Sequence, residues 1–321
     1  LVKKLLIGER VLIVTDNIVA NLYVDKIKKS LEKENIIISV CVLENGEANK
    51  NIEGISNIYS TLAKNELSRK DMIIALGGGV VGDMAGYAAA TWMRGVDFIQ
   101  IPTTLLACVD SSVGGKTGIN IAEGKNLVGA FHSPKLVIID SETLESLPKR
   151  EFNAGMSEIV KHALLFDEKL LEIIENHYNK NEKLNIDFVL KRNCELKSHI
   201  VQIDYKEKKE RMFLNFGHTI GHSVENASGY GVLLHGEAVA IGMIFAIEYG
   251  IKLGITKNKN ILERVKNILS NIGLPINIPE NINLKEAIKL DKKRNNEKIN
   301  FVFLEDIGKP IIEKVDINSI M

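Results

Sequence analysis

The first half of the chain alternates short apolar runs with amphipathic segments. The apolar runs are typical of buried parallel strands, and they cover residues 11–16, 36–43, 71–76, 98–101 and 136–140. Between the first three runs, residues 17–33 and 52–65 show helical spacing, and Leu22, Ile27 and Leu31 are predicted to lie on an apolar helix face. This β-α-β-α alternation predicts a parallel sheet with helices packed on it.

After Pro148 the pattern changes to a series of predicted helices, with glycine and proline mainly between them. These helices cover residues 151–166, 168–177, 187–201, 216–227, 237–253 and 259–272. A chain of 321 residues is too long for one small core, so two domains are expected. We predict an α/β, Rossmann-like domain at residues 1–145 and an all-helical domain at residues 146–321.

The third predicted strand runs directly into the segment Gly77-Gly78-Gly79-Val80-Val81-Gly82-Asp83. Its glycines match G-x-G-x-x-G between a strand and a small-residue helix predicted at residues 84–91, which is where this motif has physical meaning. Without side chains, the backbone N–H groups can approach a pyrophosphate, and the helix N-terminus adds a favourable dipole. Three successive glycines also make a plain tight turn, so both interpretations stay open.

A second glycine-rich stretch, residues 109–118, contains the sequence Gly114-Gly115-Lys116-Thr117. It resembles the end of a P-loop, but the first glycine of that motif would fall at Asp110, so an NTPase is disfavoured. Lys116 and Lys125 are expected to bracket a flexible loop, with Asn126 directly after it. Such groups would suit a phosphate or carboxylate ligand, and solvated loop lysines are an equal alternative.

Three histidines in the second half suggest a metal site. His218 and His222 stand four positions apart, which places them on one face of a helix, and His235 follows on the next segment. Imidazole is a common metal ligand, although a hydrogen-bonded or surface pair has the same spacing. Glu158 and Lys161 stand three positions apart, for which a surface ion pair is the default interpretation.

Composition narrows the classes of partner. Apolar residues make up 45% and charged residues 26% of the chain, which is ordinary for a globular protein. Lys+Arg and Asp+Glu both number 41, so no general attraction to nucleic acid or membrane is expected. The three cysteines lack C-x-x-C spacing, and no signal-peptide layout is present, which favours a cytoplasmic protein. Because the chain begins at Leu1, we expect it to be trimmed at its start.

Taken together, these motifs resemble the 3-dehydroquinate synthases, a family within the sugar-phosphate cyclases. The matching blocks are residues 77–83, 94–95, 101–118, 124–126, 155–158, 214–222 and 234–237, with a weaker match at 291–293. The similarity runs from about Val11 to the end of the chain. It implies an N-terminal NAD-binding domain, a C-terminal helical domain that binds metal and substrate, and an active site between them.

The resemblance also implies roles for individual residues. Zinc, with cobalt as an alternative, would be bound by Glu158, His218 and His235, whereas His222 would contact the substrate phosphate. The NAD contacts would be Asp16, Glu47, Lys50, Gly78, Gly79, Val80, Asp83, Thr103, Thr104 and Lys125. The catalytic residues would be Asp110, Lys116, Lys161, Lys197, Arg211, Asn215 and His222. The phosphate contacts would be Arg94, Lys116, Asn126, Asn215, His222, Lys292 and Lys293, with Arg94 supplied by the second subunit of a homodimer.

The implied reaction converts 3-deoxy-D-arabino-heptulosonate 7-phosphate to 3-dehydroquinate and phosphate in the shikimate pathway of aromatic amino acid biosynthesis. It would proceed by transient NAD-linked oxidation, phosphate elimination, re-reduction and aldol cyclisation, which makes the enzyme a phosphorus–oxygen lyase. The chain departs from the family pattern at residues 120–122, where an Asn-His-Pro-like segment is usual, and at residues 204–210, which are more basic than the acidic form usual there. A family strand ahead of Val11 is also missing.

Three alternatives remain at this level. A metal-dependent polyol dehydrogenase would share the two-domain plan but has no use for the phosphate-binding residues. A cyclase acting on glucose 6-phosphate or sedoheptulose 7-phosphate would not need Lys161 and Arg211, which suit a carboxylate. A binding module without enzymatic activity would have no need of the intact set Glu158, His218 and His235.

Overall fold

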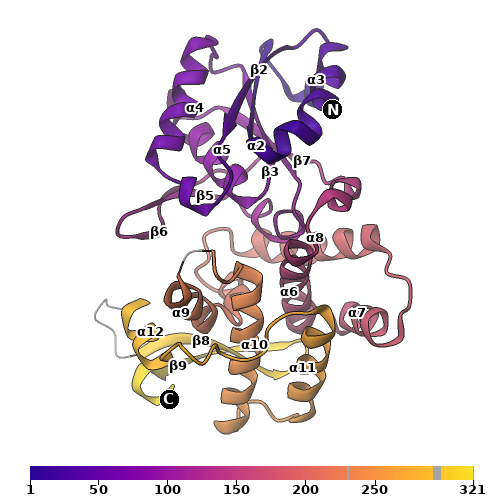
Figure 1. Ribbon diagram of the computed structural model, residues 1–321, viewed down its shortest axis with the longest axis vertical. Coiled ribbons are helices and arrows are strands. Elements are labelled where there is room, and N and C mark those ends of the chain that lie inside the picture. Colours follow the sequence, from indigo (N-terminus) through magenta and orange to yellow (C-terminus); the bar gives the residue numbers. More distant parts are fainter. Residues whose placement is uncertain (230, 292–297, 321) are drawn as a thin grey trace. The chain divides into compact units, whose positions relative to one another are not determined.

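The computed structural model describes residues 1–229, 231–291 and 298–320 of the chain (Figure 1). The chain forms two compact units, Leu1–Leu147 and Pro148–Met321. Each unit is built around its own packed elements and is described by itself. The first unit is α/β and the second is mainly helical, which confirms the predicted fold class.

The first unit contains a five-stranded parallel sheet with the strand order β2-β1-β3-β4-β7. The strands are β1 (Arg10–Asp16), β2 (Ile37–Leu43), β3 (Met72–Gly77), β4 (Asp97–Pro102) and β7 (Leu136–Val137). Each was predicted from its apolar run, although β7 is only two residues long. From β1 the order continues to β2 on one side and to β3 on the other. The crevice at the carboxyl ends of such a pair is where open α/β sheets bind ligands.

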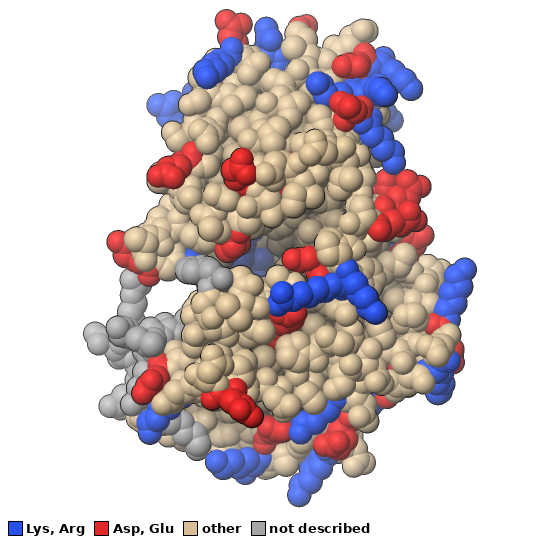
Figure 2. Space-filling view, viewed as in Figure 1, with Lys and Arg blue, Asp and Glu red and all other residues tan. Residues whose placement is uncertain are grey.

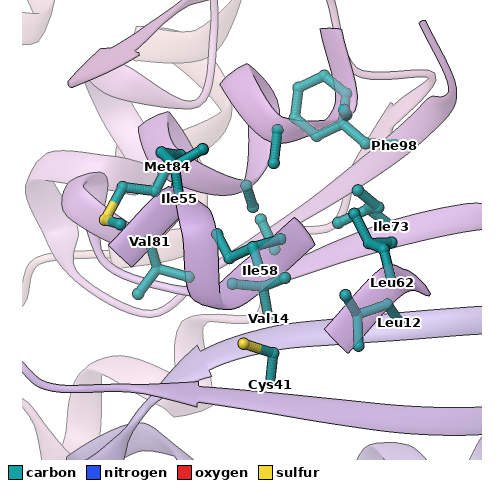
Figure 3. Close-up of a cluster of buried hydrophobic side chains, with 14 of the residues drawn as sticks. Leu12, Val14, Cys41, Ile55, Ile58, Leu62, Ile73, Val81, Met84 and Phe98 are labelled. Atoms are coloured by element: carbon teal, nitrogen blue, oxygen red, sulfur yellow. The ribbon is translucent and has the colours of Figure 1, made fainter. Parts of the chain in front are cut away.

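Alternating side chains of the central strands divide the apolar core into two layers. Leu12 and Val14 of β1 face the helices α4 (Ile52–Lys64) and α5 (Gly79–Thr91), where they meet Ile58 (Figure 3). Their neighbours Val11 and Ile13 point to the opposite layer, which is covered by the N-terminal helical segment. Because these side chains are fully buried on both faces of β1, its pairing register is strongly fixed.

The first long helical segment contains a π turn that the sequence did not predict. It consists of α2 (Asn17–Val19), a π-helical stretch at Ala20–Val24 and α3 (Asp25–Glu32). The wider turn brings Val19 and Val24, five positions apart, to the buried face. The prediction for Leu22 is therefore wrong: its side chain is 51% exposed, while Leu31 is buried and Ile27 is half-buried as expected.

Two further segments differ from the prediction. Helix α5 begins at Gly79 instead of residue 84, because the glycine turn itself forms the start of the helix. Lys116 and Lys125 do not bracket a flexible loop, since they lie on β5 (Lys116–Ile121) and β6 (Gly124–Phe131) of an antiparallel hairpin. In this hairpin a Cβ on Gly129 would lie 2.1 Å from Thr117 O, so the two strands approach too closely there for a larger residue.

The second unit consists of seven described α-helices and a two-stranded ribbon. The helices are α6 (Lys149–Phe166), α7 (Glu168–Lys180), α8 (Ile186–Ile203), α9 (His218–Ser228), α10 (His235–Lys252), α11 (Asn260–Ile272) and α12 (Leu284–Asp291). The predicted helices are present with small shifts at their ends. The antiparallel pair β8 (Lys298–Asp306) and β9 (Lys309–Asp316) was not predicted, so this unit is not purely helical.

The unpredicted ribbon covers α10 with aromatic side chains. Phe301 and Phe303 of β8 are fully buried, and their ring centroids lie 5.9 and 5.8 Å from that of Tyr249 on α10. Such aromatic contacts contribute about 1 kcal/mol each beyond the area that they bury. The ribbon therefore anchors the far end of the helix that begins at His235.

Positive and negative side chains are both spread over the visible face of each unit (Figure 2). This mixture agrees with the equal numbers of basic and acidic residues in the sequence. Among the described residues, none of the helices combines the length and the apolar character needed to cross a bilayer.

Asp71 anchors the start of β1, and its substitution by asparagine should destabilise the first unit. Its Oδ1 accepts hydrogen bonds from the backbone N–H groups of Glu9 and Arg10 at 3.1 and 2.9 Å. Its Oδ2 accepts from the backbone N–H and the hydroxyl of Ser68, both at 2.7 Å. An amide would turn an N–H₂ group toward donors, so we expect a loss of about 2–3 kcal/mol at pH 7. Thermal unfolding of wild type and of Asp71→Asn measures this loss of stability.

The same contacts set the pH dependence of this effect. Burial alone would raise the pKa of Asp71, but the hydrogen bonds from Ser68, Arg10 and Glu9 lower it below its ordinary value. The stabilisation is therefore complete above pH 4 to 5 and is lost as the pH falls through the folded pKa. The difference between wild type and Asp71→Asn should shrink below about pH 4. Asp97→Asn, which removes the exposed pair with Lys135, is the control and should cost less than about 1 kcal/mol.

Candidate metal and nucleotide sites

The second unit brings its three motif histidines together. His218 and His222 lie one turn apart on α9, and His235 is the first residue of α10. The ring centroid of His218 lies 5.3 Å from that of His222 and 5.2 Å from that of His235. The rings of His222 and His235 are 5.7 Å apart. The three imidazoles therefore form one cluster, which is compatible with metal binding.

Glycines allow the helices that carry these histidines to approach closely. A Cβ on Gly242 of α10 would lie 1.9 Å from the carbonyl oxygen of Gly217, which immediately precedes α9. A Cβ on Gly236 would lie 1.9 Å from the carbonyl oxygen of Ala154 on α6. Both distances are far below a normal contact. The glycines therefore fix α9 and α6 against α10 at the level of the histidine cluster.

The N-terminus of α10 is further held by Glu237. Its carboxylate accepts the backbone N–H of Leu234 at 2.8 Å and two hydrogen bonds from the guanidinium of Arg150, at 2.7 and 2.8 Å. Burial alone would raise the pKa of Glu237, but Arg150 and the Leu234 N–H lower it, so the carboxylate stays ionised. These bonds fix the backbone next to His235.

Glu158 lies on α6, and its carboxylate faces the Nε2 atoms of two histidines of the cluster. Its Oε1 is 3.7 Å from Nε2 of His218 and 3.7 Å from Nε2 of His235. Its other oxygen forms an ion pair with Lys161, and the two side chains are 0% and 1% exposed. The default interpretation of this pair as a surface contact is therefore wrong. A buried ion pair is expensive in desolvation, because both charges give up their hydration.

The buried charges shift the pKa values of the cluster. Burial alone would raise the pKa of Glu158, but Lys161 and the two histidines outweigh it and hold this pKa well below its usual range. Burial and the nearby Lys161 charge hold the pKa of His218 well below its ordinary value. Burial opposes protonation of His235 too, but Glu158 and Glu225 raise its pKa to about 9. An anionic carboxylate and a neutral imidazole are thus in place as metal ligands.

The donor atoms fit a divalent cation. Two ligands that each lie about 2.0–2.1 Å from a tetrahedral ion are roughly 3.4 Å apart, close to the 3.7 Å observed between Glu158 Oε1 and each Nε2. Apart from the ion pair with Lys161, neither carboxylate oxygen has a hydrogen-bond partner in the part of the chain that the structure describes. One carboxylate and two imidazoles would leave open positions, as in catalytic zinc sites.

The three histidines alone are a second grouping with metal-site geometry. In that set the exposed His222 would replace the fully buried Glu158. Both sets share His218 and His235, so they differ only in the third ligand, which is Glu158 in one and His222 in the other. The orphaned oxygen of Glu158 favours the set that contains the carboxylate.

Other predicted substrate residues of the second unit lie on α8 and on the segment before α9. Lys197 and Arg211 are 5% and 3% exposed, which is rare for cationic side chains. Arg211 donates to the carbonyl oxygen of Tyr205 at 2.6 Å. Asn215 donates from Nδ2 to Oε1 of Glu207 at 2.7 Å. Hydrogen bonds therefore orient the Arg211 guanidinium and the Asn215 amide.

The glycine motif of the first unit lies at the carboxyl end of β3. Gly77 ends the strand, Gly78 is the N-cap residue of α5, and no side chain of the described residues caps this 13-residue helix. A Cβ on Gly78 would approach Thr104 Cγ2 at 3.1 Å. The turn therefore leaves the first N–H groups of α5 open at the switch point between β1 and β3, where a phosphate would be favoured.

A polar network surrounds Lys50 beside this helix. Lys50 is 4% exposed, and its Nζ donates to Asp83 Oδ2 and to Asn126 Oδ1, both at 2.6 Å. Burial outweighs Lys50 and raises the pKa of Asp83. Asn120 donates to Oε1 of Glu47 at 2.8 Å and accepts the backbone N–H of Asn126 at 2.9 Å. The hairpin and α5 are thus joined by hydrogen bonds.

The remaining predicted residues of the first unit have separate surroundings. Asp16 caps α2 by accepting the N–H groups of Ile18 and Val19, both at 2.9 Å. Thr103 is buried, and its hydroxyl has no partner among the described residues. Thr104 accepts the N–H of Ala107 at 3.2 Å. Val80 and Asp110 are half-buried, Lys125 is half-buried on β6, and Lys116 is exposed on β5.

Arg94 lies in a strained turn between α5 and β4. Met93 and Arg94 have φ values of 47° and 68°, and both side chains are exposed. The left-handed region costs a residue other than glycine about 1–2 kcal/mol. Such strain is concentrated at functional sites. Lys292 and Lys293, the predicted phosphate contacts near the C-terminus, lie outside the described residues.

Three residues that the structure places in these clusters were not predicted from the sequence: Glu207, Asn120 and Glu225. Glu207 accepts from Asn215, Asn120 bridges Glu47 and Asn126, and Glu225 contacts His235. Glu225 had a usable signal, because it stands seven positions after His218 and therefore two helical turns along the same face. Glu207 and Asn120 lie outside helices, where spacing carries no such signal.

Comparisons with known proteins agree with this arrangement. The family model for the N-terminal region of 3-dehydroquinate synthase matches residues 40–154, and that for its C-terminal region matches residues 155–294. A 3-dehydroquinate synthase of Prochlorococcus marinus (strain MIT 9312) is 45% identical over 309 residues, which cover 94% of this chain and 85% of the relative.

Two solved structures have the same fold. A 2-deoxy-scyllo-inosose synthase, complexed with carbaglucose-6-phosphate, NAD⁺ and Co²⁺, has a TM-score of 0.88 and 27% identity, with 98% of this chain and 89% of the other covered. The 2-epi-5-epi-valiolone synthase ValA of Streptomyces hygroscopicus subsp. jinggangensis 5008, with NAD⁺ and Zn²⁺ bound, has a TM-score of 0.88 and 28% identity, with 97% and 88% covered. With both family models matched, the chain belongs to the 3-dehydroquinate synthase family.

Proposed function

We propose that the chain converts 3-deoxy-D-arabino-heptulosonate 7-phosphate to 3-dehydroquinate and inorganic phosphate, as a phosphorus–oxygen lyase of the shikimate pathway. The observation that carries this proposal is the buried carboxylate of Glu158, 3.7 Å from the Nε2 atoms of His218 and His235. It occurs in a chain that is 45% identical to a 3-dehydroquinate synthase over most of its length. As a biosynthetic enzyme it would act in the cytoplasm.

The metal would be a divalent ion, zinc or cobalt, held by Glu158, His218 and His235. When bound, it supplies a Lewis acid that lowers the pKa of a coordinated hydroxyl group. Lys161 contributes by keeping Glu158 ionised, since its charge lowers the pKa of that carboxyl. The two related synthases contain Co²⁺ or Zn²⁺, which supports a divalent ion here.

The nucleotide would be NAD, which accepts a hydride and later returns it. The open N-terminus of α5 and the turn at Gly78 and Gly79 suit its pyrophosphate. The buried Lys50 and the half-buried Asp83 form an ion pair beside this turn and would fix the orientation of groups that contact the cofactor. The further contacts proposed on the resemblance are Asp16, Glu47, Val80, Thr103, Thr104 and Lys125.

The substrate carries a carboxylate, a phosphate and several hydroxyl groups. Lys161 and the guanidinium of Arg211 would bind the carboxylate, which a simple sugar phosphate lacks. Asp110 and Lys197 would orient hydroxyl groups. The phosphate contacts proposed on the resemblance are Arg94, Lys116, Asn126, Asn215, His222, Lys292 and Lys293. Arg94 would come from a second copy of the chain, and its exposed, strained turn suits such a role.

Supplying the heptulosonate phosphate with NAD⁺ and Zn²⁺ tests this proposal directly. We expect equimolar release of inorganic phosphate and 3-dehydroquinate without net accumulation of NADH, because the hydride is returned within each cycle. Glucose 6-phosphate and sedoheptulose 7-phosphate, which lack the carboxylate, should release no phosphate. Net NADH formation from a polyol, with no phosphate release, would instead identify a dehydrogenase and contradict the proposal.

A further inference from the structure

His235 is contacted by carboxylates on both sides of its ring. On one side its Nε2 is 3.7 Å from Glu158 Oε1, and on the other its Nδ1 is 3.3 Å from Glu225 Oε2. His218 has a related but weaker arrangement, because its Nδ1 is 3.1 Å from the carbonyl oxygen of Phe216 and its Nε2 faces Glu158. Each imidazole is therefore held at Nδ1 by an oxygen while its Nε2 points to the same carboxylate.

These contacts fix the tautomer of both rings. A carbonyl oxygen and a carboxylate accept hydrogen bonds, so Nδ1 carries a proton in each histidine. In the neutral form that binds a metal, the lone pair is then on Nε2, on the side of the ring that faces Glu158. The arrangement at His235 has the form of a carboxylate–histidine–metal triad, in which an outer carboxylate orients a metal-binding imidazole.

Helix α9 places Glu225 in this position. Glu225 stands seven residues after His218 and three after His222, so the three side chains lie on one helical face. This face of α9 thus carries His218, which is a proposed ligand, and Glu225, which contacts the proposed ligand His235. The Glu225 side chain is 14% exposed, so water competes weakly for its hydrogen bond.

We propose that Glu225 is the positioning residue of the metal site: it holds His235 in the Nδ1–H tautomer and makes its Nε2 the stronger donor. The proposal rests on the metal site of the proposed function and goes beyond its ligands. A carboxylate increases the electron density on the imidazole more than a neutral carbonyl does. His235 and His218 are therefore unequal ligands, and removal of the Glu225 charge weakens the site without removing a ligand.

Zinc affinity of the full chain tests the role of Glu225. Wild type, Glu225→Gln and Glu225→Ala are stripped with a chelator and titrated with Zn²⁺ against a chromophoric competitor. Both variants should bind zinc about 10- to 100-fold more weakly. Glu225→Asp, which keeps the charge but shortens the side chain, should recover part of the affinity. Glu172→Gln on α7 removes an exposed carboxylate of the same unit and should bind zinc as wild type does.

Two readouts separate positioning from general damage to the fold. The visible absorption of the Co²⁺-loaded protein reports the ligand field, and its bands should shift in Glu225→Gln but not in Glu172→Gln. Thermal unfolding of the metal-free variants should match that of metal-free wild type. Unchanged zinc affinity and cobalt spectrum in both Glu225→Gln and Glu225→Ala would overturn the proposal. A wild type without zinc affinity would instead remove the metal site and the proposed function with it.

Discussion

Glu158→Gln is expected to abolish zinc binding and to lower kcat/KM by about a thousandfold or more. The substitution keeps the shape of the side chain but removes the charge that faces Nε2 of His218 and of His235 at 3.7 Å. A metal ion acting as a Lewis acid contributes several kcal/mol to a reaction, and about 4 kcal/mol corresponds to a thousandfold change in rate. Zinc content after dialysis and the phosphate-release assay measure the two effects.

Loss of zinc from this variant could also follow from damage to the fold, because Lys161 would lose its buried partner. Breaking a buried ion pair costs about 3–5 kcal/mol, whereas replacing both charges by apolar groups is often neutral. The double variant Glu158→Gln with Lys161→Met should therefore unfold at a higher temperature than Glu158→Gln alone. It should still bind no zinc, since restored stability does not restore the missing ligand.

His222→Asn discriminates between the two sets of ligands. If the ion is held by Glu158, His218 and His235, this variant keeps its zinc and loses activity, because His222 is then a substrate contact. If the three histidines hold the ion, His222→Asn loses zinc and Glu158→Gln retains it. The second result would contradict the ligand assignment and leave the histidine cluster intact as a site.

Local patterns predicted most of the elements, and their failures have physical causes. The strands β1, β3 and β4 are buried on both faces and therefore appear as mainly apolar runs. The π turn at Ala20–Val24 changes the helical period, so the prediction for Leu22 failed. Residues 298–316 form a ribbon whose buried strand packs on α10, a contact between segments about 50 residues apart that no local pattern reports.

The candidate site was predictable only where it is local. The pair His218 and His222 follows from helical spacing, whereas the approach of Glu158 to His218 joins positions 60 apart in the chain. Spacing alone favoured a surface ion pair for Glu158 and Lys161, and only the family resemblance predicted a ligand there. Glu207 was missed because it lies in an irregular turn after α8, where its contact with Asn215 has no sequence signature.

Gly242→Ala should damage stability and zinc binding together. Its Cβ would lie 1.9 Å from Gly217 O and 2.9 Å from Gly221 N, which are the acceptor and donor of the first hydrogen bond of α9, 2.9 Å long. Both atoms belong to the backbone, so no side chain can rotate out of the way. Carbon atoms normally keep more than 3 Å from such groups, so α9 must retreat by about 1 Å or more. We expect a loss of about 3 kcal/mol or more.

The retreat of α9 also separates the proposed metal ligands, because His218 starts α9 while His235 starts α10. Zinc affinity should therefore fall, and the thermal stabilisation that zinc gives to wild type should shrink with it. Gly54→Ala in α4 is the control: its Cβ would lie 2.3 Å from Cε of Met84, the end of a flexible side chain, and 3.0 Å from Asn49 O, and alanine favours the helix by about 1 kcal/mol. That variant should change the free energy of unfolding by less than about 1 kcal/mol and leave zinc binding unchanged. If Gly242→Ala kept wild-type stability and zinc affinity, the packing of α9 on α10 would not depend on this contact. The prediction that the glycine fixes the spacing of the histidines would then be wrong.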